Sequence, residues 1–165
     1  MHIALYQPDI AQNTGTILRF CACLDVDAHI IEPAGFAASD RTMRRAGMDY
    51  LDHVRLRRHL SWAAFLEWRR QEVPGARLLL LTTRSDTPYF AFPYAESDIL
   101  LLGRESAGVP PDVHAAADAR LSVPMQAGMR SLNVAVAAAM VAGEALRQAR
   151  WTVDTGAGGS VAPQP

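Results

Sequence analysis

The 165-residue chain is half apolar and one-fifth charged, with a net charge of −1, a composition typical of one globular domain. No apolar run approaches the roughly 18 residues of a membrane-spanning helix. No basic segment precedes an apolar stretch at the start of the chain, so neither a membrane protein nor a secretion signal is expected. The two cysteines, Cys21 and Cys23, fit neither a disulfide framework nor a metal site. We expect core thiols in a reducing compartment, the cytoplasm.

Short apolar strands and amphipathic helices alternate along the chain. The pattern predicts strands at 2–6, 29–31, 77–82, 99–102 and 121–123, with a brief strand near Val54. It predicts helices at 17–24, 62–71, 111–117 and 131–150, and a short helix within 34–50. Nearly continuous apolar strands are typical of sheets buried on both faces, so we expect an α/β fold, a single-domain parallel sheet flanked by helices on both faces. The domain covers 1–151, and 152–165 form a tail rich in Gly, Ala and Pro.

Two strand ends and the start of the last helix lie close together within residues 99–134. The run at 99–102 leads into Gly103, and the strand at 121–123 ends at Pro124. Ligands of α/β proteins bind at the carboxyl ends of parallel strands, so the sequence predicts a ligand site here. The spacing G-R-E-S-A-G at 103–108 matches neither the dinucleotide fingerprint nor a Walker motif, which disfavours a Rossmann-type oxidoreductase.

Three segments, in this order, resemble the SPOUT superfamily of RNA methyltransferases: Asn13-Thr14-Gly15 with Arg19, then 102–110, then Val123-Pro124-Met125 followed by 130–134. The resemblance covers residues 1 to about 150 and implies a C-terminal trefoil knot around 121–150, although knots are almost absent from other proteins. Residues 6–19 and 31–50 look like the subgroup of small tRNA 2′-O-methyltransferases that act on the wobble cytidine or uridine, nucleotide 34.

The resemblance implies S-adenosyl-L-methionine as methyl donor, the tRNA anticodon stem-loop as acceptor, and a homodimer formed through the first and last helices. It assigns the donor contacts to Leu81, Gly103, Val123, Met125, Ser131 and Leu132. It assigns catalysis to Asn13, Arg19, Glu105 and Ser131. A guanidinium stays protonated at ordinary pH, so we expect Arg19 to stabilise a developing alkoxide or to bind phosphate rather than to remove a proton.

Other roles stay open for some of these residues. Asn13 is also a candidate N-cap of the first helix, and Ser131 of the last helix. Glu105 is expected to orient either Arg19 or its own loop through a charge-assisted hydrogen bond. Asn133 is expected to hold the loop of the knot rather than to react.

Arginine is concentrated between residues 41 and 70, which carry eight arginines against three acidic residues. Arginine binds phosphates and stacks on bases, but the cluster alone is equally typical of a solvated face of paired charges. Together with the resemblance, it predicts an RNA-binding surface. The predicted surface comprises Arg41, Arg44, Arg45, Arg55, Arg57 and Arg58. The five histidines show no ligand spacing, and no metal is expected. A ribosomal-RNA ribose 2′-O-methyltransferase and a non-catalytic RNA-binding module remain the alternative functions.

Overall fold

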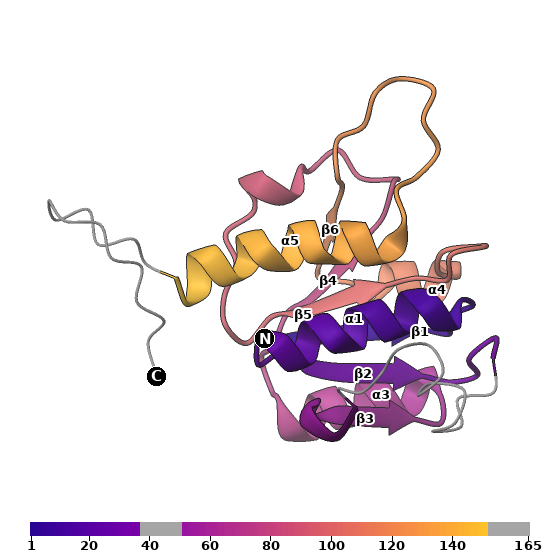
Figure 1. The fold of residues 1–165 in the computed structure, drawn as a ribbon, viewed down its shortest axis with the longest axis vertical. Helices are drawn as coiled ribbons and strands as arrows, with labels where there is room; N and C mark the ends of the chain where they lie inside the picture. Colours follow the sequence, from indigo (N-terminus) through magenta and orange to yellow (C-terminus); the bar gives the residue numbers. More distant parts are fainter. Residues whose placement is uncertain (37–50, 152–165) are drawn as a thin grey trace, which may run out of the picture.

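The computed structural model describes residues 1–36 and 51–151. Within these ranges, strands form one six-stranded sheet in the order β3-β2-β1-β5-β4-β6, and every neighbouring pair is parallel. The strands are β1 (His2–Tyr6), β2 (Asp27–Ile31), β3 (Leu56–His59), β4 (Leu78–Leu81), β5 (Ile99–Leu102) and β6 (Ala119–Leu121). Their carboxyl ends therefore lie at one edge of the sheet, called the carboxyl edge below (Figure 1).

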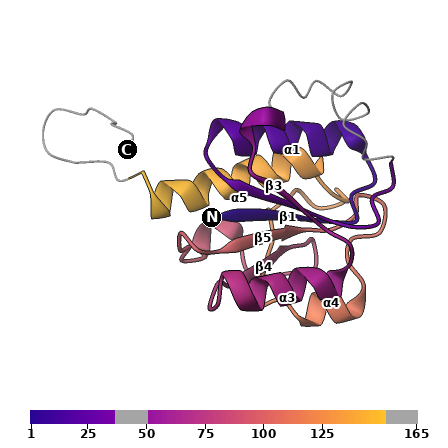
Figure 2. The same cartoon turned by 90° about the horizontal axis from the view of Figure 1, so that it is seen from below.

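Helices cover both faces of the sheet, as predicted (Figure 2). One face carries α1 (Ala11–Cys23) and α5 (Val134–Ala149), which lie side by side. The other face carries α3 (Trp62–Glu72) and the short α4 (Pro111–Ala115). Two 3₁₀ turns, η1 (Leu51–His53) and η2 (Tyr89–Ala91), complete the described elements.

The core has two layers because alternate residues of each strand point to opposite faces of the sheet. Ile3 and Leu5 of β1 pack in the layer under α1 and α5. Ala4 and Tyr6 of the same strand pack in the layer under α3, together with Phe65. Burial on both faces explains why β4 and β5, in the interior of the sheet, are continuous apolar runs.

Three boundaries near the carboxyl edge differ from the sequence prediction. Elsewhere, the strand expected near Val54 spans Leu56–His59, and the strand expected at 29–31 begins at Asp27. The first helix begins at Ala11, so Asn13 lies inside its first turn and is not its N-cap, which is Ile10. The last helix begins at Val134 rather than at 131, and its N-cap is Asn133. The last strand ends at Leu121, because the chain beyond it leaves β4 and pairs with the loop at 87–89, where the N–H of Tyr89 donates to the carbonyl of Ser122 at 2.8 Å.

Other predictions have mixed outcomes. Cys21 is buried, but Cys23 is exposed, so the expectation of two core thiols is wrong for Cys23; it follows Cys21 by two helical positions, which turns it away from the core. The helix expected within 34–50 falls largely on 37–50, which lie outside the described residues, as does the tail at 152–165.

Among the helices described, none is long and apolar enough to cross a membrane. The knot stays a prediction from the resemblance; the chain does return from edge strand β6 to place α5 beside α1 (Figure 1).

Candidate functional site

A cavity of about 650 Å³ opens at the carboxyl edge of the sheet. Its walls come from the loops after β4 and β5 and from the segment between β6 and α5. This volume suits a ligand of cofactor size. The cavity is lined by all six residues that the resemblance assigns to the donor: Leu81, Gly103, Val123, Met125, Ser131 and Leu132. The structure thus brings these residues together, and their contact with a donor stays a prediction.

The turn after β5 brings main chain to the cavity wall. The N–H of Gly108 donates to the carbonyl of Arg104 at 2.8 Å, and the N–H of Arg104 donates back to the carbonyl of Gly108 at 3.0 Å. A Cβ atom at Gly103 would lie only 2.7 Å from the carbonyl carbon of Gly108, so a larger residue requires the backbone to shift. Gly108 has a φ of +68°, which glycine adopts without strain. Both glycines are therefore needed for the shape of this wall.

The three sequence segments behind the family resemblance meet through side-chain hydrogen bonds. The Nδ2 of Asn13 donates to Oε1 of Glu105 at 3.1 Å. The Nδ2 of Asn133 donates to Oδ1 of Asn13 at 3.0 Å. The Oδ1 of Asn133 accepts from the N–H groups of Ala135 and Val136, which begin α5. Glu105 therefore links the turn after β5 to α1, and Asn133 links α1 to α5, as expected of a residue that holds this loop.

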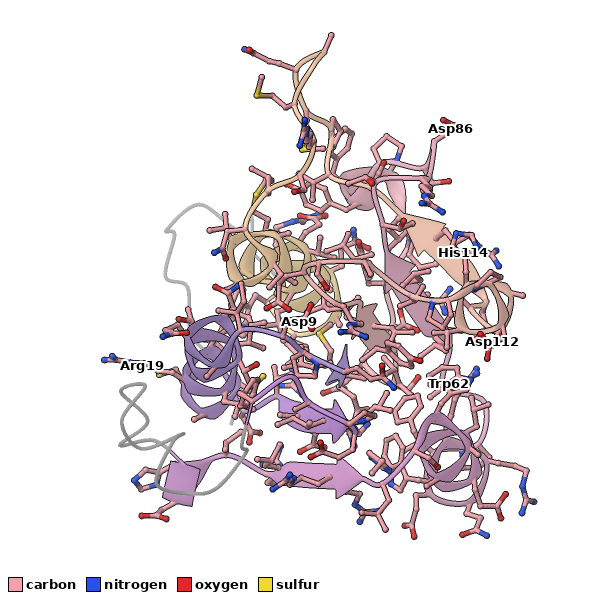
Figure 3. The ribbon with its side chains drawn as sticks, turned by 90° about the vertical axis from the view of Figure 1, so that its right-hand side faces the viewer. Asp9, Arg19, Trp62, Asp86, Asp112 and His114 are labelled. Atoms are coloured by element: carbon pink, nitrogen blue, oxygen red, sulfur yellow. The ribbon has the colours of Figure 1, made fainter. Side chains whose placement is uncertain are left out.

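Arg19 does not line the cavity. It follows Asn13 by six residues of α1, which corresponds to about 9 Å along the helix and a rotation of about 240°. Its side chain is exposed and points outward from α1, on the side away from Asp9 (Figure 3). The structure therefore places Asn13, Glu105 and Ser131 at the cavity and separates Arg19 from it within one chain.

The loop after β4 and one residue of α4 also belong to the site, although the sequence did not predict them there. Thr83 and Arg84 line the cavity, as does His114, whose Nδ1 accepts from Nε of Arg120 at 3.2 Å. Thr83 and Arg84 could have been predicted from the sequence. They come just after the buried strand β4, whose carboxyl end lies at the same edge of the sheet as Gly103.

Asp9 is another residue near the site that the sequence did not predict. It lies in the loop between β1 and α1, near the centre of the carboxyl edge (Figure 3). Its carboxylate accepts hydrogen bonds from Arg104 and Ser106. The hydroxyl of Ser106 has the largest effect in lowering the pKa of Asp9, and the N–H of Ser106 and Arg104 act in the same direction. Asp9 is therefore held as a carboxylate against the turn after β5.

The arginines predicted to bind RNA do not share one edge of the sheet. Arg55 precedes β3, at the edge opposite the cavity, and pairs with Asp25 and Asp27. Arg57 lies over Trp68, with 5.7 Å between its guanidinium carbon and the ring centroid.

The third arginine of this group, Arg58, lies near the carboxyl end of β3, and its Nε donates to Oε1 of Glu32 at 3.0 Å. The remaining three, Arg41, Arg44 and Arg45, lie outside the described residues. Within the described ranges, no group of three or more His, Cys, Asp or Glu side chains is arranged to hold a metal ion.

Comparison with known proteins extends these observations. Residues 1–143 match the SpoU rRNA methylase family. A relative from Beijerinckia indica, named tRNA (cytidine(34)-2′-O)-methyltransferase, is 64% identical over 146 residues, which are 88% of this chain and 90% of the relative.

Solved structures of methyltransferases also resemble this chain. One, described as concerning "the 2-OH methylation of C/U34 on tRNA", superposes with a TM-score of 0.82 at 44% identity, over 89% of this chain and 94% of the other. The SpoU methyltransferase AviRb from Streptomyces viridochromogenes, solved in complex with the cofactor AdoMet, superposes with a TM-score of 0.80 at 25% identity, over 90% of this chain and 60% of AviRb. The chain belongs to the SpoU rRNA methylase family.

Proposed function

We propose that this protein is an enzyme that transfers a methyl group from S-adenosyl-L-methionine to the 2′-hydroxyl of nucleotide 34, a cytidine or uridine, in tRNA. The observation that carries the proposal is the 64% identity to a tRNA (cytidine(34)-2′-O)-methyltransferase over most of both chains. The cavity supports it, because the residues that the family resemblance assigns to the donor all line that cavity.

The chemistry of the cavity walls fits the donor. Leu81, Val123 and Leu132 offer apolar surfaces for the faces of an adenine ring, and the main chain around Gly103 offers hydrogen-bonding groups for its edge. When bound there, S-adenosyl-L-methionine would supply an electrophilic methyl group and would leave as S-adenosyl-L-homocysteine. The protein's own task is to hold the ribose hydroxyl in line with that group and to stabilise negative charge on the oxygen as its proton leaves.

The position of Arg19 favours a site completed by two copies of the chain. Arg19 lies outside its own cavity, whereas α1 and α5 lie side by side on one face of the sheet. On α5, Val136 and Met140 are four residues apart and are 50% and 39% exposed, which gives this helix an apolar outer stripe. We propose that this face packs against the same face of a second copy, and that Arg19 of one copy serves the cavity of the other.

A mixing experiment tests this arrangement. Arg19→Ala and Gly103→Ala are each expected to inactivate the enzyme, the first in the acceptor site and the second in the donor site. Refolded together in equal amounts, they are expected to recover about a quarter of the wild-type activity, since half of the dimers are mixed and each mixed dimer has one complete site. No recovery in a sample in which mixed dimers are shown to have formed would show that Arg19 serves its own cavity.

The acceptor is proposed to be the tRNA anticodon stem-loop, which places the enzyme in the cytoplasm. Arg58, at the carboxyl end of β3, and the arginines at 41, 44 and 45 are the proposed phosphate contacts. The proposed RNA surface does not include Arg55, which lies at the opposite edge of the sheet and pairs with Asp27. It does not include Arg57 either, because the guanidinium of Arg57 lies over the ring of Trp68. Ribosomal RNA stays the alternative acceptor, because the matching family is named for it.

The direct test is transfer of a labelled methyl group to tRNA and, separately, to ribosomal RNA. The proposal expects label in tRNA, loss of that label in Arg19→Ala, and unchanged donor binding in that variant. Label only in ribosomal RNA would replace the acceptor and keep the reaction. Donor binding without transfer to either RNA would favour the non-catalytic module.

A further inference from the structure

Asp9 does not line the cavity, yet it contacts each of three consecutive residues that do, namely Arg104, Glu105 and Ser106. We propose that Asp9 is a positioning residue for methyl transfer: its carboxylate fixes the turn after β5, and this turn holds Glu105 in place against Asn13. The inference rests on the proposed function and adds a residue to its site.

Both carboxylate oxygens of Asp9 accept hydrogen bonds from the turn after β5. The Oδ1 atom accepts from Nε and Nη2 of Arg104 at 3.2 and 3.0 Å. The Oδ2 atom accepts from the N–H and the hydroxyl of Ser106 at 3.0 and 2.5 Å. Hydrogen bonds to an ionised acceptor are stronger than neutral ones, and four of them on one carboxylate fix its orientation.

The main chain of Asp9 adds a contact to Glu105 itself. The N–H of Asp9 donates to Oε2 of Glu105 at 2.9 Å, while Oε1 of Glu105 accepts from Asn13 at 3.1 Å. Both carboxylate oxygens of Glu105 are therefore held by groups of the β1–α1 segment. From Asn13 the hydrogen bonds continue to Asn133 and the start of α5.

A second loop also packs against Asp9. The N–H of Gly35, in the loop after β2, donates to the carbonyl of Pro8 at 2.8 Å. A Cβ atom at Gly35 would lie 3.1 Å from the Cα of Asp9, which shows how closely the two loops approach. Asp9 is thus enclosed between the loop after β2 and the turn after β5, and a change in its charge is transmitted to the turn.

The variant Asp9→Asn tests this role, because it keeps the size of the side chain but removes its charge. It also places an amide NH₂ against groups that are themselves donors. A loosened turn misplaces Glu105, so we expect kcat for tRNA methylation to fall by between about 10- and 100-fold. Asp9→Glu, which restores a carboxylate, is expected to recover part of that loss.

Asp118→Asn is the matched control. Asp118 also accepts from an arginine, Arg69, and from a backbone N–H, that of Leu78 at 2.6 Å. It lies just before β6, at the sheet edge away from the cavity. We expect this variant to lose stability without a comparable loss of kcat.

A double variant separates positioning from a general loss of stability. If Asp9 acts through Glu105, then Asp9→Asn has little further effect on kcat in a Glu105→Gln background. Fully multiplicative losses would overturn the inference, as would a kcat for Asp9→Asn no lower than that for Asp118→Asn. Absence of transfer by the wild-type enzyme to any RNA would overturn the proposed function, and the role of Asp9 with it. An active wild type with an equally active Asp9→Asn would overturn the role of Asp9 alone.

Discussion

Mild acid is expected to destabilise this protein through a row of three histidines, one on each of β1, β2 and β3. The Nδ1 of His2 lies 3.1 Å from Nε2 of His29, and Nδ1 of His29 lies 3.0 Å from Nε2 of His59. A neutral imidazole has one donor and one acceptor nitrogen, so three neutral rings can hydrogen-bond in a row. A protonated His29 has two donors and no acceptor, so it keeps both hydrogen bonds only if one neighbouring ring changes tautomer, and its positive charge is then buried in the row.

His29 is the buried centre of the row, 3% exposed and packed against the ring of Trp68 at 4.1 Å between centroids. Burial lowers the pKa of His29 to about 3, and His2, His59 and Arg57 act in the same direction. Burial also lowers the pKa of His2, against which the carboxylate of Asp27 has a smaller opposing effect. The pKa of His59 is lowered as well, by burial and by Arg57.

The direction of the pH effect on stability follows from the protons that the folded and the unfolded chain each bind. In the unfolded chain a histidine has a pKa near 6.5, so below this pH the unfolded chain binds a proton that folded His29 does not bind until the pH nears 3. The free energy of unfolding therefore falls with the pH across this window. For His29 alone the loss is about 2 kcal/mol between about pH 7.5 and about pH 5. The carboxylates contribute little there, because their unfolded pKa values lie near 4.

Urea unfolding at these two pH values measures the effect. The wild type is expected to lose about 2 kcal/mol or more of unfolding free energy at the lower pH. In His29→Gln the part due to His29, about 2 kcal/mol, is expected to disappear, while the contributions of His2 and His59 remain. His53→Gln, which removes an exposed histidine, is the control and is expected to behave like the wild type. An unchanged pH dependence in His29→Gln would refute the reasoning.

Three further predictions concern the site and the core. Gly103→Ala is expected to abolish donor binding measured by calorimetry, because its Cβ would lie 2.7 Å from Gly108; binding at wild-type affinity would contradict this. Asn133→Ala is expected to lower the free energy of unfolding by about 1–2 kcal/mol, since α5 loses its N-cap; urea unfolding without a shift would count against it. Phe65→Ala is expected to cost about 3–5 kcal/mol in the same assay, because Phe65 is fully buried between α3 and the sheet; a loss under 1 kcal/mol would contradict that packing.

The sheet and the cavity walls were predictable because their signals are local. Buried strands appear as apolar runs, and parallel strands end at a common edge, so the residues after them share a site. The start of α5 was less predictable, since Ser131 and Asn133 are both good N-caps. Asn133 is the cap in the structure, where its side chain also contacts Asn13, 120 positions earlier in the chain.

Contacts between distant residues account for the features that the sequence did not indicate. Asp9 and Ser106 are 97 positions apart, and an aspartate between a proline and an isoleucine carries no signal of such a partner. The histidine row joins residues 27 and 30 positions apart, one from each strand, and depends on the register of the sheet. Arg55 and Arg58 are only three positions apart in sequence but lie at opposite ends of β3, because a strand extends about 3.3 Å per residue.

The most direct test of the proposed function is to map the methylated nucleotide. The substrate is tRNA from cells that lack this enzyme, which carries its other modifications but an unmethylated nucleotide 34. After reaction with labelled S-adenosyl-L-methionine, nuclease digestion and mass spectrometry locate the new methyl group. The proposed function predicts 2′-O-methylcytidine or 2′-O-methyluridine at position 34, and none with Arg19→Ala. A methyl group on a base, or on the ribose of another nucleotide, would contradict it.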